Sequence, residues 1–152
     1  MEAFLLIVHV LGGILFVGPV TIANSLFPRY VPLAAEYGKP DYSARTLPVA
    51  HALHRISRVY GLLGLLVPVA GIALALTQQR FGEIWITIAM VITAVAGGLM
   101  AFRIVPAQSA ALAIPPDKRA ASRLGALAGI FNVLWVAVLI LMVVRPGSDY
   151  VS

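Results

Sequence analysis

Hydrophobic residues fall into four long runs along the chain, and shorter polar stretches separate one run from the next. The runs cover residues 3–27, 59–77, 84–102 and 124–144, and each is close to the roughly 20 apolar residues that an α-helix needs to cross a bilayer. Within a run the apolar residues are continuous and do not alternate with a period of two, which argues against β-strands. The pattern predicts an all-α polytopic membrane protein, a bundle of four transmembrane helices.

Turn and start signals set the expected helix boundaries. Pro48 favours a helix start near that residue, and Pro115, Pro116 and Asp117 form a turn and start signal before the fourth run. We therefore expect helices at about 3–27, 49–77, 84–105 and 118–144, with a loop from residue 106 up to the turn. Because the first run follows Glu2 and has no small-residue cleavage site, we expect a mature helix rather than a signal peptide. The whole chain, 1–152, is predicted to form a single transmembrane domain.

The basic residues are distributed unequally between the two sides of this bundle. Nine of the 11 lie in or beside the connections that follow the first and third helices: Arg29, Lys39, Arg45, Arg55, Arg58, Arg103, Lys118, Arg119 and Arg123. The turn after the second helix holds only Arg80, and the C-terminal tail holds Arg145. Lys and Arg near membrane helices are retained on the cytoplasmic side. The distribution predicts both basic connections in the cytoplasm and both termini outside it, an N-out/C-out topology.

Composition agrees with this interpretation and removes several classes of function. Hydrophobic residues make up 61% of the chain and charged residues only 11%, which is too apolar for a soluble domain of this length. The net charge of +5 does not indicate nucleic-acid binding, because the basic residues flank apolar runs. The chain has no cysteine, so disulfides and thiolate metal sites are absent. No acidic residue lies in mid-membrane, which disfavours a proton-coupled transporter or a carboxylate-based hydrolase, and the sequence does not decide whether the protein is an enzyme.

His9 is the titratable residue that lies well inside an apolar run, and intramembrane ionisable groups are functional candidates. Gly12 and Gly13 follow it, and small residues allow a neighbouring helix or a flat cofactor to approach the backbone. We predict that His9, Gly12 and Gly13 form a cofactor site, with haem b as the cofactor. The second axial position would be open, or would be filled by Met90, Met142 or the same histidine of a second subunit.

A simpler interpretation of His9 stays open beside this one. A neutral histidine in a membrane helix can hydrogen-bond to another helix, here to Asn132 or to an exposed carbonyl, and so hold the bundle together without any cofactor.

His51, His54, Arg55 and Arg58 are spaced three, four and seven residues apart, which puts all four on one helix face at the membrane boundary. Two imidazoles at this spacing can chelate a divalent metal, so His51 and His54 are predicted metal ligands. Arg55 and Arg58 are predicted to bind an anion or a lipid headgroup through charge-assisted hydrogen bonds. The alternative is that the two arginines set the topology and meet anionic lipid while the histidines are solvated.

The opening segment FLLIVHVLGGILFVGPV resembles the first helix of small bacterial membrane proteins related to the copper-resistance protein D group. The later segment HALHRISRVYGLLGLLVPVAGIALAL is similar to the second helix of an uncharacterised branch of that group. The resemblance implies a four-helix bundle in the bacterial plasma membrane, with His9 at the position of a histidine suspected of binding haem or copper. The absence of cysteine and of a Met-rich tract favours haem or quinone association over copper transport.

These observations lead to one preferred function and two alternatives. The preferred function is a small plasma-membrane protein that binds a redox cofactor (haem b) or a metal in a respiratory or metal-homeostasis pathway. The first alternative is a non-enzymatic accessory or scaffold subunit of a larger membrane complex or homo-oligomer, which packs through small-residue faces such as Gly125 and Gly129. The second is a binder or transporter of an anionic amphiphile, such as a lipid or quinone.

Overall fold

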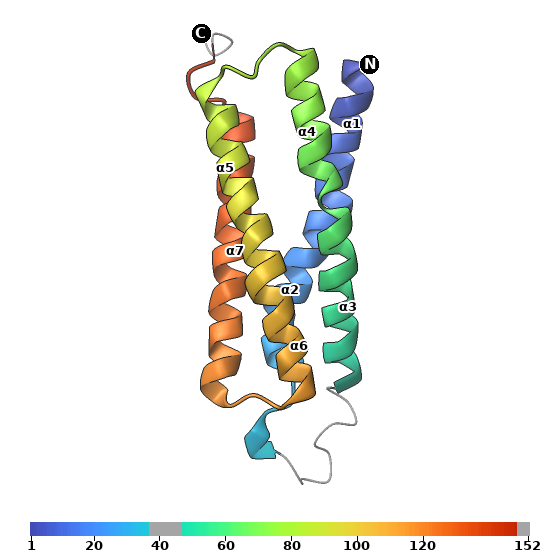
Figure 1. Ribbon diagram of the computed structural model, residues 1–152, viewed down its shortest axis with the longest axis vertical. Coiled ribbons are helices and arrows are strands. Elements are labelled where there is room, and N and C mark those ends of the chain that lie inside the picture. Colours follow the sequence, from blue (N-terminus) through green and yellow to red (C-terminus); the bar gives the residue numbers. More distant parts are fainter. Residues whose placement is uncertain (37–46, 149–152) are drawn as a thin grey trace.

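The computed structural model describes residues 1–36 and 47–148, which form a four-helix bundle without any strand (Figure 1). Four spans in this part of the chain are long and apolar enough to cross a membrane: Glu2–Tyr30, Leu47–Thr77, Ile84–Ala113 and Lys118–Val144. Consecutive spans run in opposite directions, so both chain ends lie at the same end of the bundle. The all-α four-helix fold predicted from the hydropathy pattern is confirmed.

Three of the spans are interrupted, and only the fourth is one continuous helix. The first consists of α1 (Glu2–Gly12), a π-helical turn η1 (Gly13–Val17) and α2 (Gly18–Tyr30). The second consists of α3 (Leu47–Leu63) and α4 (Leu66–Thr77), and the third of α5 (Ile84–Leu99), a second π-helical turn η3 (Met100–Ile104) and α6 (Val105–Ala113). The fourth is α7 (Lys118–Val144), and a short 3-10 turn η2 (Ala34–Glu36) follows the first span.

Proline accounts for each interruption. Proline has no backbone N–H, so it cannot donate to the carbonyl four residues earlier, and its ring crowds that carbonyl. Before Pro19 and before Pro106 the helix widens by one residue, and the N–H groups of Gly18 and Val105 donate to carbonyls five residues back. Before Pro68 the helix breaks at Gly64, where the Val67 N–H donates to the Gly64 carbonyl only three residues back, at 3.1 Å.

The predicted end of the third helix, at residue 105, is wrong. The sequence predicts that the third helix ends at residue 105 and that a loop follows, but α6 continues the helix to Ala113. Pro106 is the second residue of α6, a position where a missing N–H is tolerated. The boundaries of the fourth helix agree with the prediction, and Asp117 caps it by accepting a hydrogen bond from the Ala120 N–H at 2.6 Å.

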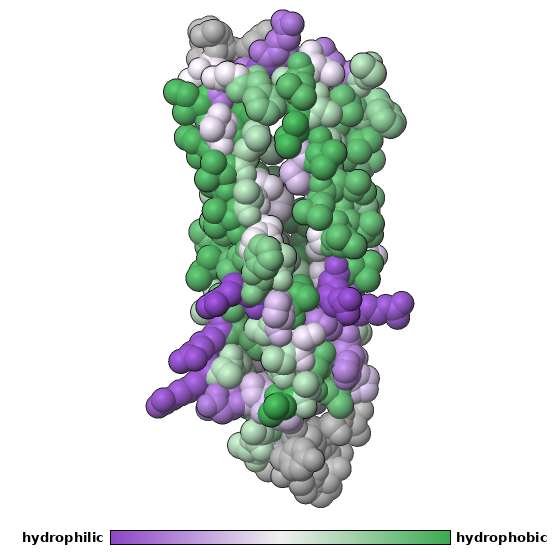
Figure 2. Space-filling model, viewed as in Figure 1, coloured by the Kyte–Doolittle hydropathy of each residue, from purple (hydrophilic) through white to green (hydrophobic). Residues whose placement is uncertain are grey.

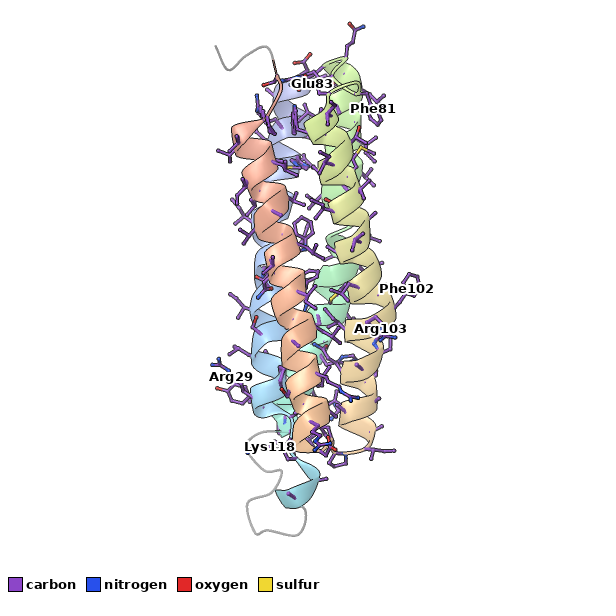
Figure 3. All side chains as sticks on the ribbon, turned by 90° about the vertical axis from the view of Figure 1, so that its left-hand side faces the viewer. Arg29, Phe81, Glu83, Phe102, Arg103 and Lys118 are labelled. Atoms are coloured by element: carbon purple, nitrogen blue, oxygen red, sulfur yellow. The ribbon has the colours of Figure 1, made fainter. Side chains whose placement is uncertain are left out.

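The bundle has two distinguishable ends, which we call the terminal end and the basic end. The terminal end holds both chain termini and the turn with Glu83, and the basic end holds Arg29 and Lys118 (Figure 3). Near the terminal end α1 packs against α4, and α5 packs against α7. Towards the basic end α2 packs against both α3 and α7.

Packing is much denser towards the basic end than towards the terminal end. The interior side chains of α2 are almost completely buried, with Val20 2% exposed, Asn24 1% and Phe27 0%. In α1, by contrast, Gly12 is the buried residue, and His9 is only half-buried. The interior face of α2 is therefore more completely buried than α1.

The outer surface carries an apolar band that covers the terminal-end part of all four spans (Figure 2). Many large apolar side chains in the band are exposed, for example Leu62, Val69 and Val133 at 69%, 62% and 68%. Exposed apolar patches of this extent are stable only when lipid or protein covers them. The spans are therefore those of a multi-pass membrane protein.

Arginines limit the apolar band on the second and third spans. Arg58 precedes the apolar stretch 59–77, and Arg103 follows the apolar stretch 84–102. Both stretches contain 19 residues, and a helix of that length spans about 28 Å, close to the hydrocarbon thickness of a bilayer. The basic-end part of the bundle, with α6 and the first turns of α3 and α7, projects beyond the band.

Candidate functional site

His9 lies in α1 with its ring against α4 and α7. Its Nδ1 atom is 2.8 Å from the Val67 carbonyl oxygen, and its Nε2 atom is 3.5 Å from the Met142 sulfur. A carbonyl oxygen can only accept a hydrogen bond, so Nδ1 carries the proton and donates it. In a neutral ring Nε2 then has a free lone pair. This lone pair faces the thioether of Met142, which has lone pairs of its own and no proton to give.

Gly71 is what allows the imidazole to lie so close to α4. A Cβ atom at position 71 would be 2.8 Å from Cε1 of His9, which is closer than real Cβ atoms approach other atoms. The sequence pattern predicted Gly12 and Gly13 for this role instead. Gly12 is buried against Val67, whereas a Cβ atom at Gly13 would meet nothing within 4 Å. The glycine that borders the ring therefore comes from the second span.

The simpler interpretation of His9, a hydrogen bond to a carbonyl of another helix, is confirmed for Nδ1. Asn132 is not its partner, because the Asn132 side-chain amide donates to Ser25 at 2.9 Å. Nε2 remains as the atom with a ligand-binding lone pair. A porphyrin bound there would have to enter between Nε2 and the Met142 sulfur, whereas a single ion needs far less space.

A second polar group lies in the densely packed part of the bundle, between α2, α3 and α6. Asn24, Ser57 and Gln108 are 1%, 0% and 1% exposed, and we call them the amide cluster. The Asn24 carbonyl oxygen accepts from the Ser57 hydroxyl at 2.9 Å and from the Gln108 amide at 3.0 Å. The Asn24 amide nitrogen is 3.3 Å from the sulfur of Met100.

The amide cluster continues to the surface through His54. Nδ1 of His54 is 3.1 Å from the Gln108 carbonyl oxygen, and Nε2 is 3.3 Å from the Ser109 hydroxyl. Because the amide oxygen can only accept, Nδ1 is the donor and Nε2 accepts from Ser109. The cluster therefore fixes both the tautomer and the orientation of this imidazole.

His51, His54, Arg55 and Arg58 do not share one environment. His51, Arg55 and Arg58 are exposed, whereas His54 is half-buried and turned towards α6. Within the described ranges, 1–36 and 47–148, no group of three or more His, Asp or Glu side chains is arranged to hold a metal ion. The metal site predicted at His51 and His54 therefore gains no further ligand from these residues, and Nε2 of His54 bonds to Ser109 instead.

Gln108 and Ser109 are among the site residues that were not predicted, because residues 106–113 were expected to form a loop. A signal for them was present in the spacing of Met100, Ile104 and Gln108. These residues recur every four positions and are all buried, as one face of a helix would be.

Glu83 is the centre of a small ionic group in the turn between α4 and α5. Its carboxylate accepts hydrogen bonds from the Arg80 guanidinium and from the indole N–H of Trp85. Arg80 first and Trp85 second hold the pKa of Glu83 below its ordinary value of 4.5. The Arg145 guanidinium carbon lies 6.0 Å from the centre of the Trp85 ring, which ties the end of α7 to this turn.

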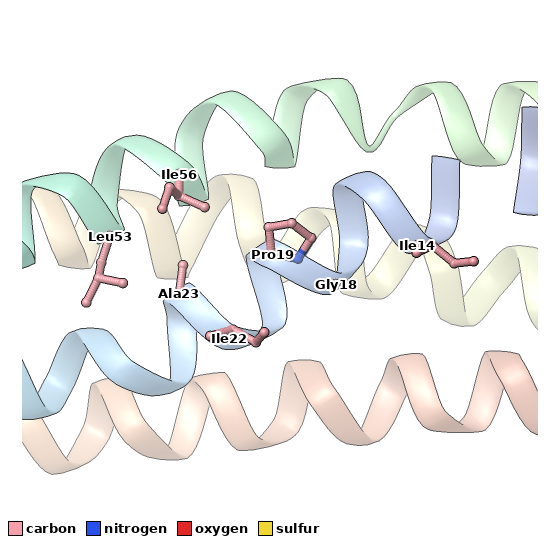
Figure 4. A pocket seen from close by; sticks show the side chains of 7 residues that line it. All are labelled: Ile14, Gly18, Pro19, Ile22, Ala23, Leu53 and Ile56. Atoms are coloured by element: carbon pink, nitrogen blue, oxygen red, sulfur yellow. The ribbon is translucent and has the colours of Figure 1, made fainter. Parts of the chain in front are cut away.

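An apolar pocket of about 400 Å³ lies between the first span and α3 (Figure 4). It lies where Gly18 leaves no side chain and where the Pro19 ring points towards α3. Its other lining residues are Ile14, Ile22, Ala23, Leu53 and Ile56. None of these side chains is titratable, so the pocket offers hydrophobic contact without chemistry.

The chain matches no family model, no curated protein and no solved structure.

Proposed function

We propose that this chain is a multi-pass protein of the bacterial plasma membrane that binds a soft metal ion between His9 and Met142, in a respiratory or metal-homeostasis pathway. The proposed orientation has the termini outside the cytoplasm, so the metal ion lies in the outer half of the bundle. The excess of Lys and Arg at the basic end supports this orientation. The terminal end carries Arg80 and Arg145, and Arg80 is paired with Glu83.

One observation carries the proposal: two lone-pair donors, Nε2 of His9 and the Met142 sulfur, face each other at 3.5 Å. A separation of 3.5 Å is van der Waals contact without a hydrogen bond, and an electrophile bound by both lone pairs would stabilise it further. A metal ion satisfies both atoms.

The distance between the two atoms suits a shared metal ion. With bonds of about 2.0 Å to nitrogen and about 2.3 Å to sulfur, atoms 3.5 Å apart subtend an angle of about 110° at the metal. Imidazole and thioether ligands together select soft ions such as Cu(I), which is stable with few ligands. The hydrogen bond from Nδ1 to the Val67 carbonyl orients the ring as in other metal-binding histidines.

Metal content tests this proposal directly. Protein purified in detergent is loaded with Cu(I), or with Ag(I) as a redox-inert substitute, and the bound metal is measured by mass spectrometry after gel filtration. We expect one ion per chain, and we expect His9→Ala and Met142→Leu each to weaken binding at least tenfold. Met90→Leu is the matched control, because Met90 is exposed on α5 and should leave binding unchanged.

Two outcomes would contradict the proposal. Undiminished metal in His9→Ala would place the ion elsewhere. A Soret band in protein from haem-supplied cells that His9→Ala abolishes would replace the metal ion with haem b, the cofactor predicted from the sequence.

A further inference from the structure

The amide cluster ends in one imidazole at the surface, and this arrangement points to a second site. We propose that the seam between α3 and α6 binds the phosphate of an anionic phospholipid through Ser109 and Arg58, with His54 holding the Ser109 hydroxyl in place. This site lies towards the basic end, away from His9, and does not depend on the metal proposal.

The first argument is the buried support behind His54. Asn24, Ser57 and Gln108 lose almost all contact with solvent, and a buried polar network of this kind is no more stabilising than apolar packing. In one branch the Ser57 hydroxyl donates to the Asn24 carbonyl oxygen. In the other branch Nδ1 of His54 donates to the Gln108 carbonyl oxygen, and the Gln108 amide donates to Asn24. The cluster therefore holds the ring so that Nε2 faces the Ser109 hydroxyl.

The second argument is the arrangement of donors around Nε2 of His54. The Ser109 hydroxyl is 3.3 Å from it and is exposed, so this hydroxyl can reach a phosphate oxygen at the surface. When a phosphate is present, the Ser109 hydroxyl turns from Nε2 and donates to the phosphate oxygen instead.

The seam between α3 and α6 also has a positive charge beside it. Along α3, at 100° per residue, Arg58 lies about 40° around the helix from His54 and one turn closer to the apolar band, whereas Arg55 lies about 100° away. Arg58 is therefore beside the seam with α6 and Arg55 is not. Neither α3 nor α6 contains an Asp or Glu, so no acidic residue of these two helices neutralises the seam.

The depth of Arg58 in the membrane favours a lipid as the source of the phosphate. Arg58 directly precedes the apolar stretch 59–77, so its guanidinium lies at the boundary of the band. Lipid phosphates lie at this boundary, with their acyl chains along the apolar surface of the band. A free phosphate ion would offer the same oxygens without the chains, and the experiment separates these two sources.

The test uses the full-length protein in a neutral detergent, with native mass spectrometry to count bound dioleoyl-phosphatidylglycerol and dioleoyl-phosphatidylcholine. We expect the wild type to retain phosphatidylglycerol in preference to phosphatidylcholine. Arg58→Gln should weaken this retention about tenfold, the effect of losing one charge-assisted hydrogen bond. Ser109→Ala should weaken it by a smaller factor. Arg55→Gln, which removes the same charge from the same helix, should change it less than twofold.

Three results would overturn the site. These are equal losses in Arg55→Gln and Arg58→Gln, no loss in Arg58→Gln, or no preference of the wild type for phosphatidylglycerol. Inorganic phosphate is added as a competitor in a second arm. If it displaces the lipid only from protein with Arg58 intact, the oxyanion site is supported and a soluble phosphate becomes its ligand. If it displaces nothing, the site is supported as specific for lipid.

Discussion

At the residue scale, the closest steric constraint near His9 is at Gly71, whose missing side chain makes room for the imidazole. Any larger residue there must push the ring away from the Val67 carbonyl or separate α1 from α4. The close contact between α1 and α4 at His9 therefore requires glycine, with no Cβ atom, at position 71.

We expect Gly71→Ala to destabilise the protein by roughly 1–3 kcal/mol, the usual cost of forcing extra volume into a packed contact. Gly13→Ala is the matched control, because a Cβ atom there meets nothing within 4 Å. Alanine is also the better helix former, so the control should be neutral or slightly stabilising. Unfolding of each variant by SDS in mixed micelles, followed by tryptophan fluorescence, measures the difference. Equal stability of the two variants would contradict the packing described for His9.

The sequence singled out His9 for a local reason, since a lone imidazole in an apolar run is conspicuous. It also indicated Met142 as one of two methionines able to fill the second axial position. Spacing along one helix does not show which residue of another helix lies opposite, so Val67 and Gly71 could not be predicted. Ser57 and Gln108 were missed for the same reason, because neither is unusual until α2, α3 and α6 are packed together.

At the element scale, proline has different effects in the three interrupted spans. Pro19 and Pro106 follow widened turns that keep the helix continuous, whereas Pro68 follows a break at Gly64. Hydropathy predicted the long apolar core of each helix well, because lipid solvation depends on composition. It failed at residues 106–113, where the choice between helix and loop depended on how a single missing N–H is accommodated.

The turn between α4 and α5 should give the protein an acid-sensitive contribution to stability. The pKa of Glu83 is lowered in the folded state, so its stabilising effect is complete above the ordinary value of 4.5 and is lost as the pH falls through the lowered value. We expect Glu83→Gln to lower the thermal midpoint at pH 7 and to differ progressively less from wild type below pH 4.5. Melting curves in detergent from pH 7 to pH 3 measure this difference. A gap that widened on acidification would have the wrong sign.

At the scale of the whole molecule, the four-span architecture was predictable because each run is long enough and apolar enough on its own. The uneven packing was not, because it depends on how the spans cross. A tight core around Asn24 and Phe27 and a looser half around His9 place the two proposed sites in different surroundings. The His9 site is half-buried beside α4 and α7, and the proposed phosphate site lies at the surface beside the buried amide cluster.

The absence of cysteine allows a direct measurement of the proposed topology. Gln78→Cys introduces a thiol into the exposed turn at the terminal end, and Ser122→Cys introduces one near the basic end of α7. In intact cells, a membrane-impermeant maleimide should label Gln78→Cys and spare Ser122→Cys until the membrane is opened. The reverse pattern would place the termini in the cytoplasm and would require the two proposed sites to exchange sides.

The equal lengths of the two stretches that end at Arg58 and Arg103 have a consequence for the choice of membrane. Two adjacent spans fix the same hydrophobic thickness, so tilting one of them cannot adapt the molecule to a thicker bilayer without tilting the other. A bilayer with longer acyl chains would have to become thinner around the protein, or the guanidinium groups would have to enter its hydrocarbon region. Either change costs a fraction of a kcal/mol for each Å of mismatch. The bundle is thus matched to a bilayer of ordinary thickness and resists a thicker one.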